Sequence, residues 1–304
     1  MSIEASRASL FEEPLRILSD LHLGHPGSRV GSAEALRPVL EGAKTVVFNG
    51  DTREMRAKRF VGDSDRMFGE LEGMLEEMGI EGRYLTGNHD HRVSEEHYLD
   101  LCGGEVFVTH GHAVFPEVSP WSFTSRADHE VCLREYERLY REYDGDTLDG
   151  RMRVAAAVCE LTPKFNRRAR RGLMGNLKTI INVTMPPRRT FSVLNTWRRH
   201  HVMARDFCRQ YRPGARFILM GHTHLPGVRS YGDLVVINTG GYISWGGARY
   251  VEVAEGELRV VAVKRDGAGR FLPGRVLRRV GLGEREIEGG GALMGEAELV
   301  GGGR

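Results

Sequence analysis

The sequence predicts an α/β fold that is interrupted by a helical insertion. Five short apolar segments read as buried strands, and each of them ends directly in Asp, Asn or His. The stretch "SDRMFGELEGMLEEMGI" between two of these segments has apolar residues at helical spacing. In α/β folds, ligands bind where strands deliver their carboxyl ends to loops, so the five polar ends are expected to converge.

The first elements follow this rhythm. A strand over 15–18 ends at Ser19-Asp20, and "SAEALRPVLEGA" reads as a short helix with Ser32 as its N-cap. "KTVVFNGD" is a second buried strand, which ends at Gly50-Asp51. The helical stripe of the next segment consists of Met67, Leu71, Met74, Leu75 and Met78.

Three further predicted strands also end in a polar residue. "RYLTGNHD" ends at Gly87-Asn88, "EVFVTHGH" at Thr109-His110, and "RFILMGHTH" at Gly221-His222. "DLVVINTGG" and "ARYVEVAEGELRVVAVKR" complete a β-rich end of the chain, and the second of these reads as a hairpin that turns near Glu255-Gly256.

Residues 113–216 interrupt the pattern and are expected to form a basic helical cap. One helical stripe comprises Cys132, Tyr136, Leu139 and Tyr143, and another comprises Phe191, Leu194, Trp197, Ala204, Cys208 and Tyr211. The predicted division is therefore a core of 14–112 and 217–265, a cap of 113–216, and a glycine-rich C-terminal extension of 266–304, which is expected to be partly mobile.

Charge is unevenly distributed, although the 304-residue chain has a net charge of only +2. Residues 151–216 contain 16 Lys and Arg against two acidic residues, and the remainder is net acidic. Such asymmetry indicates a polyanionic partner or a membrane surface. The four cysteines are far apart and read as free thiols, the N-terminus has no apolar leader segment, and no apolar run is long enough to span a membrane.

The polar residues at the strand ends are of the kinds that bind metals. They are carboxylates, one amide and imidazoles, without a thiolate: Asp20, His22, Asp51, Asn88, His89, His110, His222 and His224. This donor set suits zinc, manganese, iron or magnesium. The Asp-x-His and His-x-His spacings can each hold a metal with two side chains. The total exceeds the needs of one ion and fits two ions that share a carboxylate.

"DLH", "GDTRE", "GNHD", "HGH" and "GHTH", in this order, resemble the motifs of the calcineurin-like metallophosphoesterase superfamily. The resemblance implies a four-layer αββα sandwich with a helical cap insertion and a dinuclear metal site. It implies that Asp20, His22 and His224 bind one metal, that Asn88, His110 and His222 bind the other, and that Asp51 bridges both. Manganese is the first expectation, with iron, zinc and magnesium as alternatives.

The implied reaction is hydrolysis of a phosphodiester or pyrophosphate bond by a hydroxide that bridges the metals. His89 is then the catalytic residue that is not a ligand, placed to donate a proton to the leaving oxygen. Asp90 either orients His89 or caps the turn. His25 and His112 are expected to act behind the ligands or in the structure of the loops.

The opening "SDLHLG" and the basic insertion look most like the UDP-2,3-diacylglucosamine hydrolase branch, which acts on a lipid precursor. His89 and His112 depart from that branch, which usually has arginine and aspartate at these places. Arg167, Arg168, Arg170 and Arg171 are the candidate substrate-binding residues, facing lipid phosphate at an anionic membrane. A cytoplasmic location, peripheral on the inner face of the membrane, follows from this reading.

Three alternatives remain open from the sequence. The chain is a cytosolic phosphodiesterase or phosphatase on nucleotides or phosphoproteins, a nuclease that uses the basic insertion, or a non-catalytic scaffold. Nucleic acid is the less favoured partner because no reading module is recognisable. The sequence leaves the natural substrate and the oligomeric state open.

Overall fold

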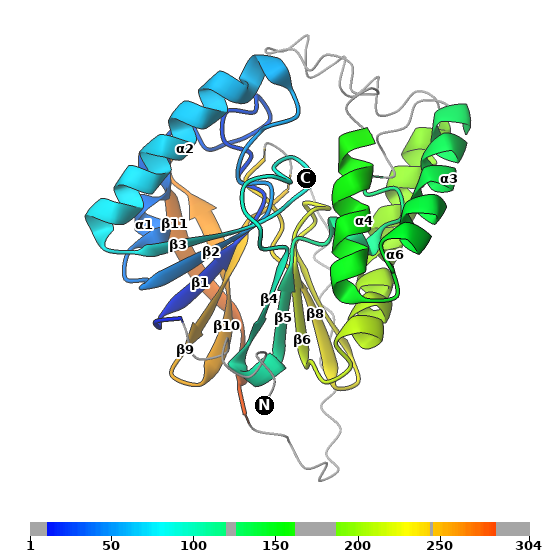
Figure 1. Ribbon diagram of the computed structural model, residues 1–304. Helices are drawn as coiled ribbons and strands as arrows, with labels where there is room; N and C mark the ends of the chain where they lie inside the picture. The colour runs from blue at the N-terminus through cyan, green and yellow to red at the C-terminus, as the bar shows by residue number, and fades with distance from the viewer. Residues whose placement is uncertain (1–10, 120–125, 162–186, 244–245, 284–304) are drawn as a thin grey trace, which may run out of the picture.

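The computed structural model describes residues 11–119, 126–161, 187–243 and 246–283. Two β-sheets pack face to face, and helices cover the outer face of each sheet (Figure 1). The layers therefore follow the order helix, sheet, sheet, helix. The predicted four-layer α/β sandwich is confirmed.

The first sheet has six strands in the order β11-β10-β9-β1-β2-β3. Their bounds are β1 Leu15–Leu18, β2 Thr45–Asn49, β3 Glu81–Leu85, β9 Arg249–Ala254, β10 Glu257–Arg265 and β11 Phe271–Gly281. Strands β1, β2 and β3 run parallel, and β9, β10 and β11 continue the sheet in antiparallel pairs. Strand β11 falls within the stretch predicted as a C-terminal extension, so the sheet continues beyond the expected boundary at residue 265.

The second sheet has five strands in the order β4-β5-β6-β8-β7. Their bounds are β4 Tyr98–Leu101, β5 Val106–Thr109, β6 Phe217–Met220, β7 Gly227–Tyr231 and β8 Leu234–Asn238. The three central strands are parallel, and the edge strands β4 and β7 are antiparallel to their neighbours. The two edge strands were not predicted, because they are mostly half-exposed and lack a continuous apolar run.

Alternation along the strands builds two kinds of core. In β2, Val47 faces the other sheet, while Val46 and Phe48 face the helices. In β5, Val108 likewise joins the core between the sheets, and Phe107 joins the core beneath the outer helices. Strands that are buried on both faces read as continuous apolar runs, which is why these segments were recognisable in the sequence.

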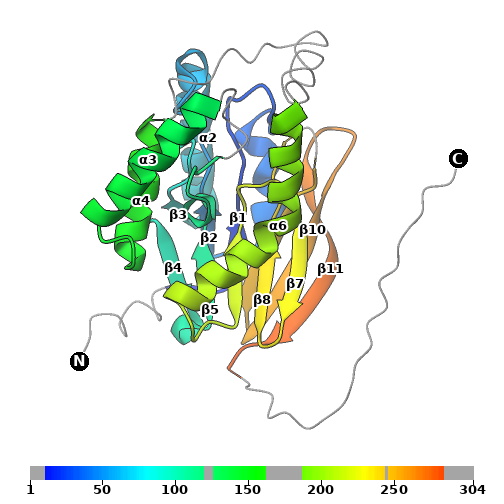
Figure 2. The ribbon, with the colours of Figure 1, turned by 90° about the vertical axis from the view of Figure 1, so that its right-hand side faces the viewer.

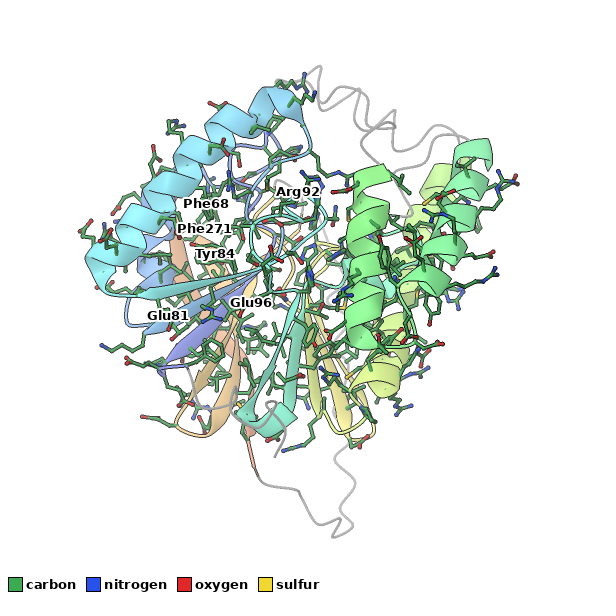
Figure 3. All side chains as sticks on the ribbon, viewed as in Figure 1. Phe68, Glu81, Tyr84, Arg92, Glu96 and Phe271 are labelled. Atoms are coloured by element: carbon green, nitrogen blue, oxygen red, sulfur yellow. The ribbon has the colours of Figure 1, made fainter. Side chains whose placement is uncertain are left out.

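The helical layer on the first sheet consists of the 3₁₀ turn η2 (Ala33–Leu36), the single-turn α1 (Arg37–Leu40) and the long α2 (Lys58–Met78). The predicted stripe of α2 is buried at Met67, Leu71, Met74 and Leu75. Phe68 of α2 packs against Tyr84 of β3 (Figure 3). Ser32 precedes η2 but makes no side-chain cap, since the 3₁₀ turn bonds through its backbone instead.

The helices α3 (Arg126–Glu142), α4 (Leu148–Leu161) and α6 (Pro187–Tyr211) cover the second sheet (Figures 1 and 2). They belong to the stretch 113–216 that was predicted as a cap, and their buried side chains form one core with β5, β6 and β8. The stretch therefore supplies the outer layer of the second sheet. Two further 3₁₀ turns, η3 (Cys102–Gly104) and η4 (His112–Val114), follow β4 and β5.

Helix α6 differs from its predicted stripe at its beginning. Ala204 and Cys208 are buried against the second sheet, but Phe191 is 78% exposed and Leu194 is 55% exposed. The first half of α6 rises above the strands, so no sheet lies beneath it (Figure 2). An apolar stripe is buried only as far as the sheet extends under the helix.

Candidate metal centre

All seven predicted metal ligands lie at the edge where the parallel strands end. Asp20 and His22 follow β1, Asp51 follows β2, and Asn88 follows β3 in the first sheet; His110 follows β5, and His222 and His224 follow β6 in the second. Six of the seven are buried, and His224 is half-buried. The predicted convergence of the strand ends is confirmed.

The turns that present these residues are strained. Five of the nine non-glycine residues with positive φ in the described part of the chain are predicted ligands: Asp20, His22, Asp51, His222 and His224. Such backbone angles are costly for residues with a side chain and concentrate at functional sites. A neighbouring glycine allows the close approach, because a Cβ at Gly221 would lie 2.0 Å from Asp20 Oδ2.

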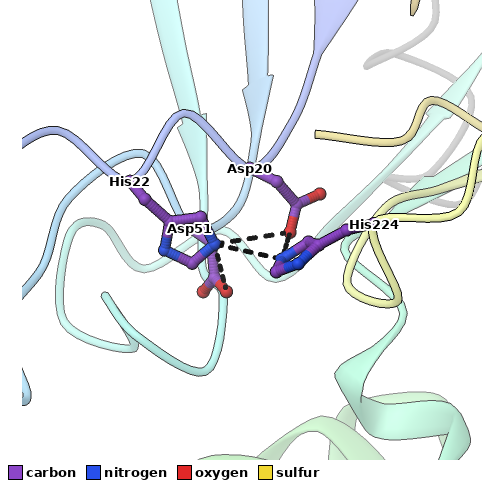
Figure 4. Close-up of side chains that lie close together, drawn as sticks. All are labelled: Asp20, His22, Asp51 and His224. Carbon is purple, nitrogen blue, oxygen red and sulfur yellow. Dashed lines mark hydrogen bonds and ion pairs between the residues drawn. The ribbon is translucent and has the colours of Figure 1, made fainter. Parts of the chain in front are cut away.

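The first group of side chains consists of Asp20, His22, Asp51 and His224, whose candidate ligand atoms all lie within 4.8 Å of one another (Figure 4). His224 Nε2 is 3.1 Å from Asp20 Oδ1 and 3.1 Å from His22 Nε2. His22 Nε2 is 3.6 Å from Asp51 Oδ2. Two imidazole nitrogens and two carboxylates thus face a common point, which is a donor set that fits a divalent ion.

The second group consists of Asp51, His110 and His222. His110 Nε2 is 3.4 Å from both Asp51 Oδ2 and Asn88 Oδ1. His110 Nδ1 donates to Asn49 O at 2.9 Å, and His222 Nε2 donates to Val118 O at 2.7 Å. Because a carbonyl can only accept, these bonds place the lone pair of each neutral ring on the opposite nitrogen, as metal-binding histidines require.

The charges in both groups are strongly coupled. Burial alone would raise the pKa of Asp51, but His110 and His89 hold that pKa well below its ordinary value. Burial lowers the pKa of His22 to about 3. For His110 burial is outweighed by Asp51 and Asp20, and its pKa rises to about 9. The site therefore contains buried anions that hold a proton on a neighbouring imidazole, and a bound cation could replace that proton.

His89 is tied to a residue that the sequence analysis did not assign. Its Nδ1 is 2.8 Å from Glu54 Oε2, and its backbone N–H donates to Asp51 Oδ1 at 2.7 Å. Glu54 is buried, while the His89 side chain keeps 23% of its surface exposed. The signal for Glu54 was present in "GDTRE", as an acid three residues after Asp51.

Two roles were open for Asp90, orienting His89 or capping the turn, and the structure shows the second. Its carboxylate accepts the backbone N–H groups of Asp51, Thr52, Arg53 and Gly87 at 2.7 to 3.1 Å. It thus joins the turn after β2 to the turn after β3, and Glu54 is the residue that orients His89.

Other polar groups lie next to the candidate ligands. Ser19 Oγ donates to Asp20 Oδ2 at 2.6 Å and lies 2.6 Å from Thr239 Oγ1. The His25 ring is 6.0 Å from that of His22, and the buried His112 ring is 5.4 Å from that of His110. Arg167, Arg168, Arg170 and Arg171 lie outside the described residues.

No protein-family profile matches the chain. No curated protein matches it either. No helix in the described part of the chain is long and apolar enough to cross a membrane.

Several solved structures are similar in arrangement at low sequence identity. A dimetal phosphatase from Danio rerio is 13% identical, with 86% of this chain and 99% of that chain covered and a TM-score of 0.43. A single mutant of Vps29 from Entamoeba histolytica is 12% identical, with 88% and 98% covered and a TM-score of 0.41. A predicted phosphoesterase from Streptococcus pneumoniae is 14% identical, with 88% and 96% covered and a TM-score of 0.35.

Proposed function

We propose that this chain is a two-metal phosphoester hydrolase of the calcineurin-like metallophosphoesterase type. The observation that carries the proposal is the position of Asp51. Its carboxylate belongs both to the group with Asp20, His22 and His224 and to the group with His110 and His222. One buried carboxylate shared by two sets of histidines is the arrangement that two neighbouring divalent ions require.

The donor atoms support this assignment. Asp20, His22 and His224 would hold one ion, Asn88, His110 and His222 the other, and Asp51 both. When bound, the two ions supply an acidified water and positive charge for the phosphoryl oxygens. Manganese, with iron, zinc or magnesium as alternatives, agrees with ligands that are imidazole, carboxylate and amide.

The chain's own contribution to the reaction centres on His89. Glu54 accepts a hydrogen bond from the N–H group at His89 Nδ1, which leaves Nε2 as the atom that delivers a proton to the departing oxygen. Burial lowers the pKa of His89, but Glu54 and Asp51 outweigh it and raise that pKa above its ordinary value. The shift favours the protonated form of His89, which is the form that a general acid needs.

The decisive variant is Asp51→Asn. It keeps the shape of the side chain but removes the shared charge, so we expect the bound metal to fall from two ions per chain and hydrolysis of bis(p-nitrophenyl) phosphate to be lost. Asp65→Asn is the matched control, because Asp65 pairs with Arg53 on the surface. A wild type with one ion per chain, or an active Asp51→Asn protein, contradicts the proposal.

For the natural substrate we propose an amphiphilic phosphodiester or pyrophosphate at an anionic membrane surface. The supporting observation is the start of α6, where Phe191 and Leu194 are exposed and Arg198 and Arg199 follow. Apolar side chains next to guanidinium groups suit the boundary between headgroups and acyl chains. The candidate arginines 167, 168, 170 and 171 precede this helix in the sequence.

Vesicle co-sedimentation tests this assignment. We expect wild type to bind phosphatidylglycerol vesicles, and a Phe191→Ser, Leu194→Ser double variant to lose binding. Val131→Ser is the control, since Val131 is an exposed apolar residue of α3. Tight binding of RNA or DNA without vesicle binding favours the nuclease, and turnover of nucleotides or phosphoproteins without vesicle binding favours the cytosolic phosphatase.

A further inference from the structure

Two nitrogens of the Arg56 guanidinium have no hydrogen-bond acceptor in the described part of the chain. Its Nε and Nη2 atoms are buried and have no hydrogen-bond partner. These two nitrogens lie on one edge of the guanidinium, and their N–H bonds point in parallel. This edge is the fork that binds a carboxylate or phosphate through two bonds. The neighbouring Arg53 and Arg92 differ in that each forms an ion pair, with Asp65 and Glu160 respectively, although Arg53 Nε is also buried without a partner among the described residues.

The backbone places Arg56 directly beside His89. The Met55 N–H donates to His89 O at 3.1 Å. Glu54 accepts the N–H groups of Arg56 and Ala57 through Oε1 at 2.9 and 3.0 Å, while its Oε2 holds His89. One carboxylate therefore positions both the proton donor and the segment that carries the unpaired guanidinium.

The Arg56 side chain also faces α4. Its charge acts on the pKa of His91, where it comes after burial and Arg92 as a cause of lowering, and on that of Cys159 in α4. Arg92 lies beside the end of α4 and pairs with Glu160 there (Figure 3). The guanidinium is thus close enough to act both on His91, in the loop after β3, and on Cys159 of α4.

A buried N–H group without an acceptor is costly, and a native structure tolerates it where a ligand or an ion supplies the acceptor. The Nε and Nη2 nitrogens of Arg56 are two such donors. A phosphoryl group has the several anionic oxygens that these donors need. A leaving oxygen that takes its proton from His89 would lie next to them.

We propose that Arg56 binds non-bridging oxygens of a substrate phosphoryl group through its Nε–Nη2 edge. The assignment rests on the proposed function, because a phosphoester must occupy the metal centre for the fork to reach it. The fork contributes to binding of the ground state, so its loss raises KM more than it lowers kcat. Lysine keeps the charge but not the two-bond geometry, and therefore does not replace arginine.

The test is equilibrium binding of inorganic phosphate to the Mn²⁺-loaded protein, measured by calorimetry for wild type, Arg56→Lys and Arg56→Ala. Hydrogen bonds to charged groups of this kind predict a rise in the phosphate Kd of about 10- to 100-fold in both variants. Arg66→Ala is the control, since it removes the same charge from an exposed pair with Glu70 on α2. Arg66→Ala should bind phosphate as wild type does.

Kinetics on bis(p-nitrophenyl) phosphate supply the second readout, with KM rising and kcat changing only a few-fold. Inorganic pyrophosphate, used as a second binding probe, shows which phosphoryl group the fork holds. A larger effect of Arg56→Ala on pyrophosphate than on phosphate assigns the fork to the second phosphoryl group, and equal effects assign it to the one at the metals.

The outcomes separate this assignment from the proposed function. Phosphate binding that depends on Arg56, in a protein that hydrolyses none of the esters, supports the fork and contradicts the hydrolase. Hydrolysis with unchanged phosphate affinity in both Arg56 variants supports the hydrolase and contradicts the role of Arg56. No phosphate binding by wild type also overturns the assignment, and Arg56→Lys keeps the test valid if Arg56→Ala does not fold.

Discussion

The two sheets contribute different chemistry to the same edge of the molecule. Loops after β1 and β2 of the first sheet supply every carboxylate in the three candidate metal-binding groups, namely Asp20, Asp51 and Glu54. Loops after β5 and β6 of the second sheet supply only imidazoles, from His110, His222 and His224. The anions and most of the neutral donors thus come from opposite halves of the sandwich.

This division shows which functions depend on the packing of the sheets. The groups that contain Asp51 combine residues from both sheets, whereas the group of His22, Glu54 and His89 comes from the first sheet alone. The proposed metal binding therefore depends on how the sheets are placed against each other. The proposed proton donation by His89 depends on one sheet and its loops.

His89→Ala sharpens this comparison and has the largest expected effect. It removes the proton donor but no ligand, so kcat should fall about 10²- to 10⁴-fold while two metals per chain are retained. The loss should be smaller for an ester of nitrophenol than for an alkyl ester, because nitrophenol leaves without a proton.

His222→Ala is the counterpart from the second sheet and should lose one metal, as elemental analysis would show. If His89→Ala also lost a metal, the group of His22, Glu54 and His89 would itself bind a metal. The proposed division between metal binding across both sheets and proton donation from the first sheet would then be wrong.

Glu54→Gln should have the next largest effect. Loss of a hydrogen-bonding partner that orients a functional side chain typically lowers activity about 10- to 100-fold. Glu54 also raises the pKa of His89, so the variant should lower that pKa. Since His89 acts in its protonated form, the alkaline limb of the kcat/KM profile should move to lower pH.

Glu117→Gln is the matched control, because Glu117 forms the same kind of pair with His129 at 2.7 Å in the segment that leads into α3. Its pH profile should follow that of wild type. An unshifted alkaline limb in Glu54→Gln would show that Glu54 does not set the charge of His89.

The smallest expected effect concerns stability in the metal-free protein. The pKa of His110 is raised to about 9, because Asp51 and Asp20 outweigh burial. The stabilisation that results is fully present below the ordinary histidine pKa of about 6.5 and is lost as pH rises towards 9. The free energy of unfolding should fall by up to about 1.4 kcal/mol per pH unit over this window.

Urea denaturation in chelator at several pH values measures this slope. His110→Gln should reduce it, with a remainder from His89, whose pKa is also raised. If the free energy of unfolding changed with pH equally in wild type and His110→Gln, Asp51 and Asp20 would not hold a proton on His110.

Much of the metal centre could be predicted because its signals are local. An apolar run followed at once by Asp or His determines which side chain leaves the end of a strand, whatever the rest of the chain does. Hence all seven ligand candidates and the strands that carry them followed from the sequence. The half-exposed edge strands β4 and β7 lacked this signal and did not.

The sequence by itself determined the residue types and their places at the strand ends, since these depend on short-range spacing; the order of the layers was expected only from the resemblance of the motifs to a known family. Only the tertiary structure decided that Glu54 rather than Asp90 contacts the His89 ring and that Phe191 and Leu194 of α6 are exposed. It also decided that Arg56 Nε and Nη2 have no acceptor in the described part of the chain. The physical reason is that these facts depend on distances between segments far apart in the chain. Such distances are set by how side chains such as Val47 and Val108 pack between the two sheets.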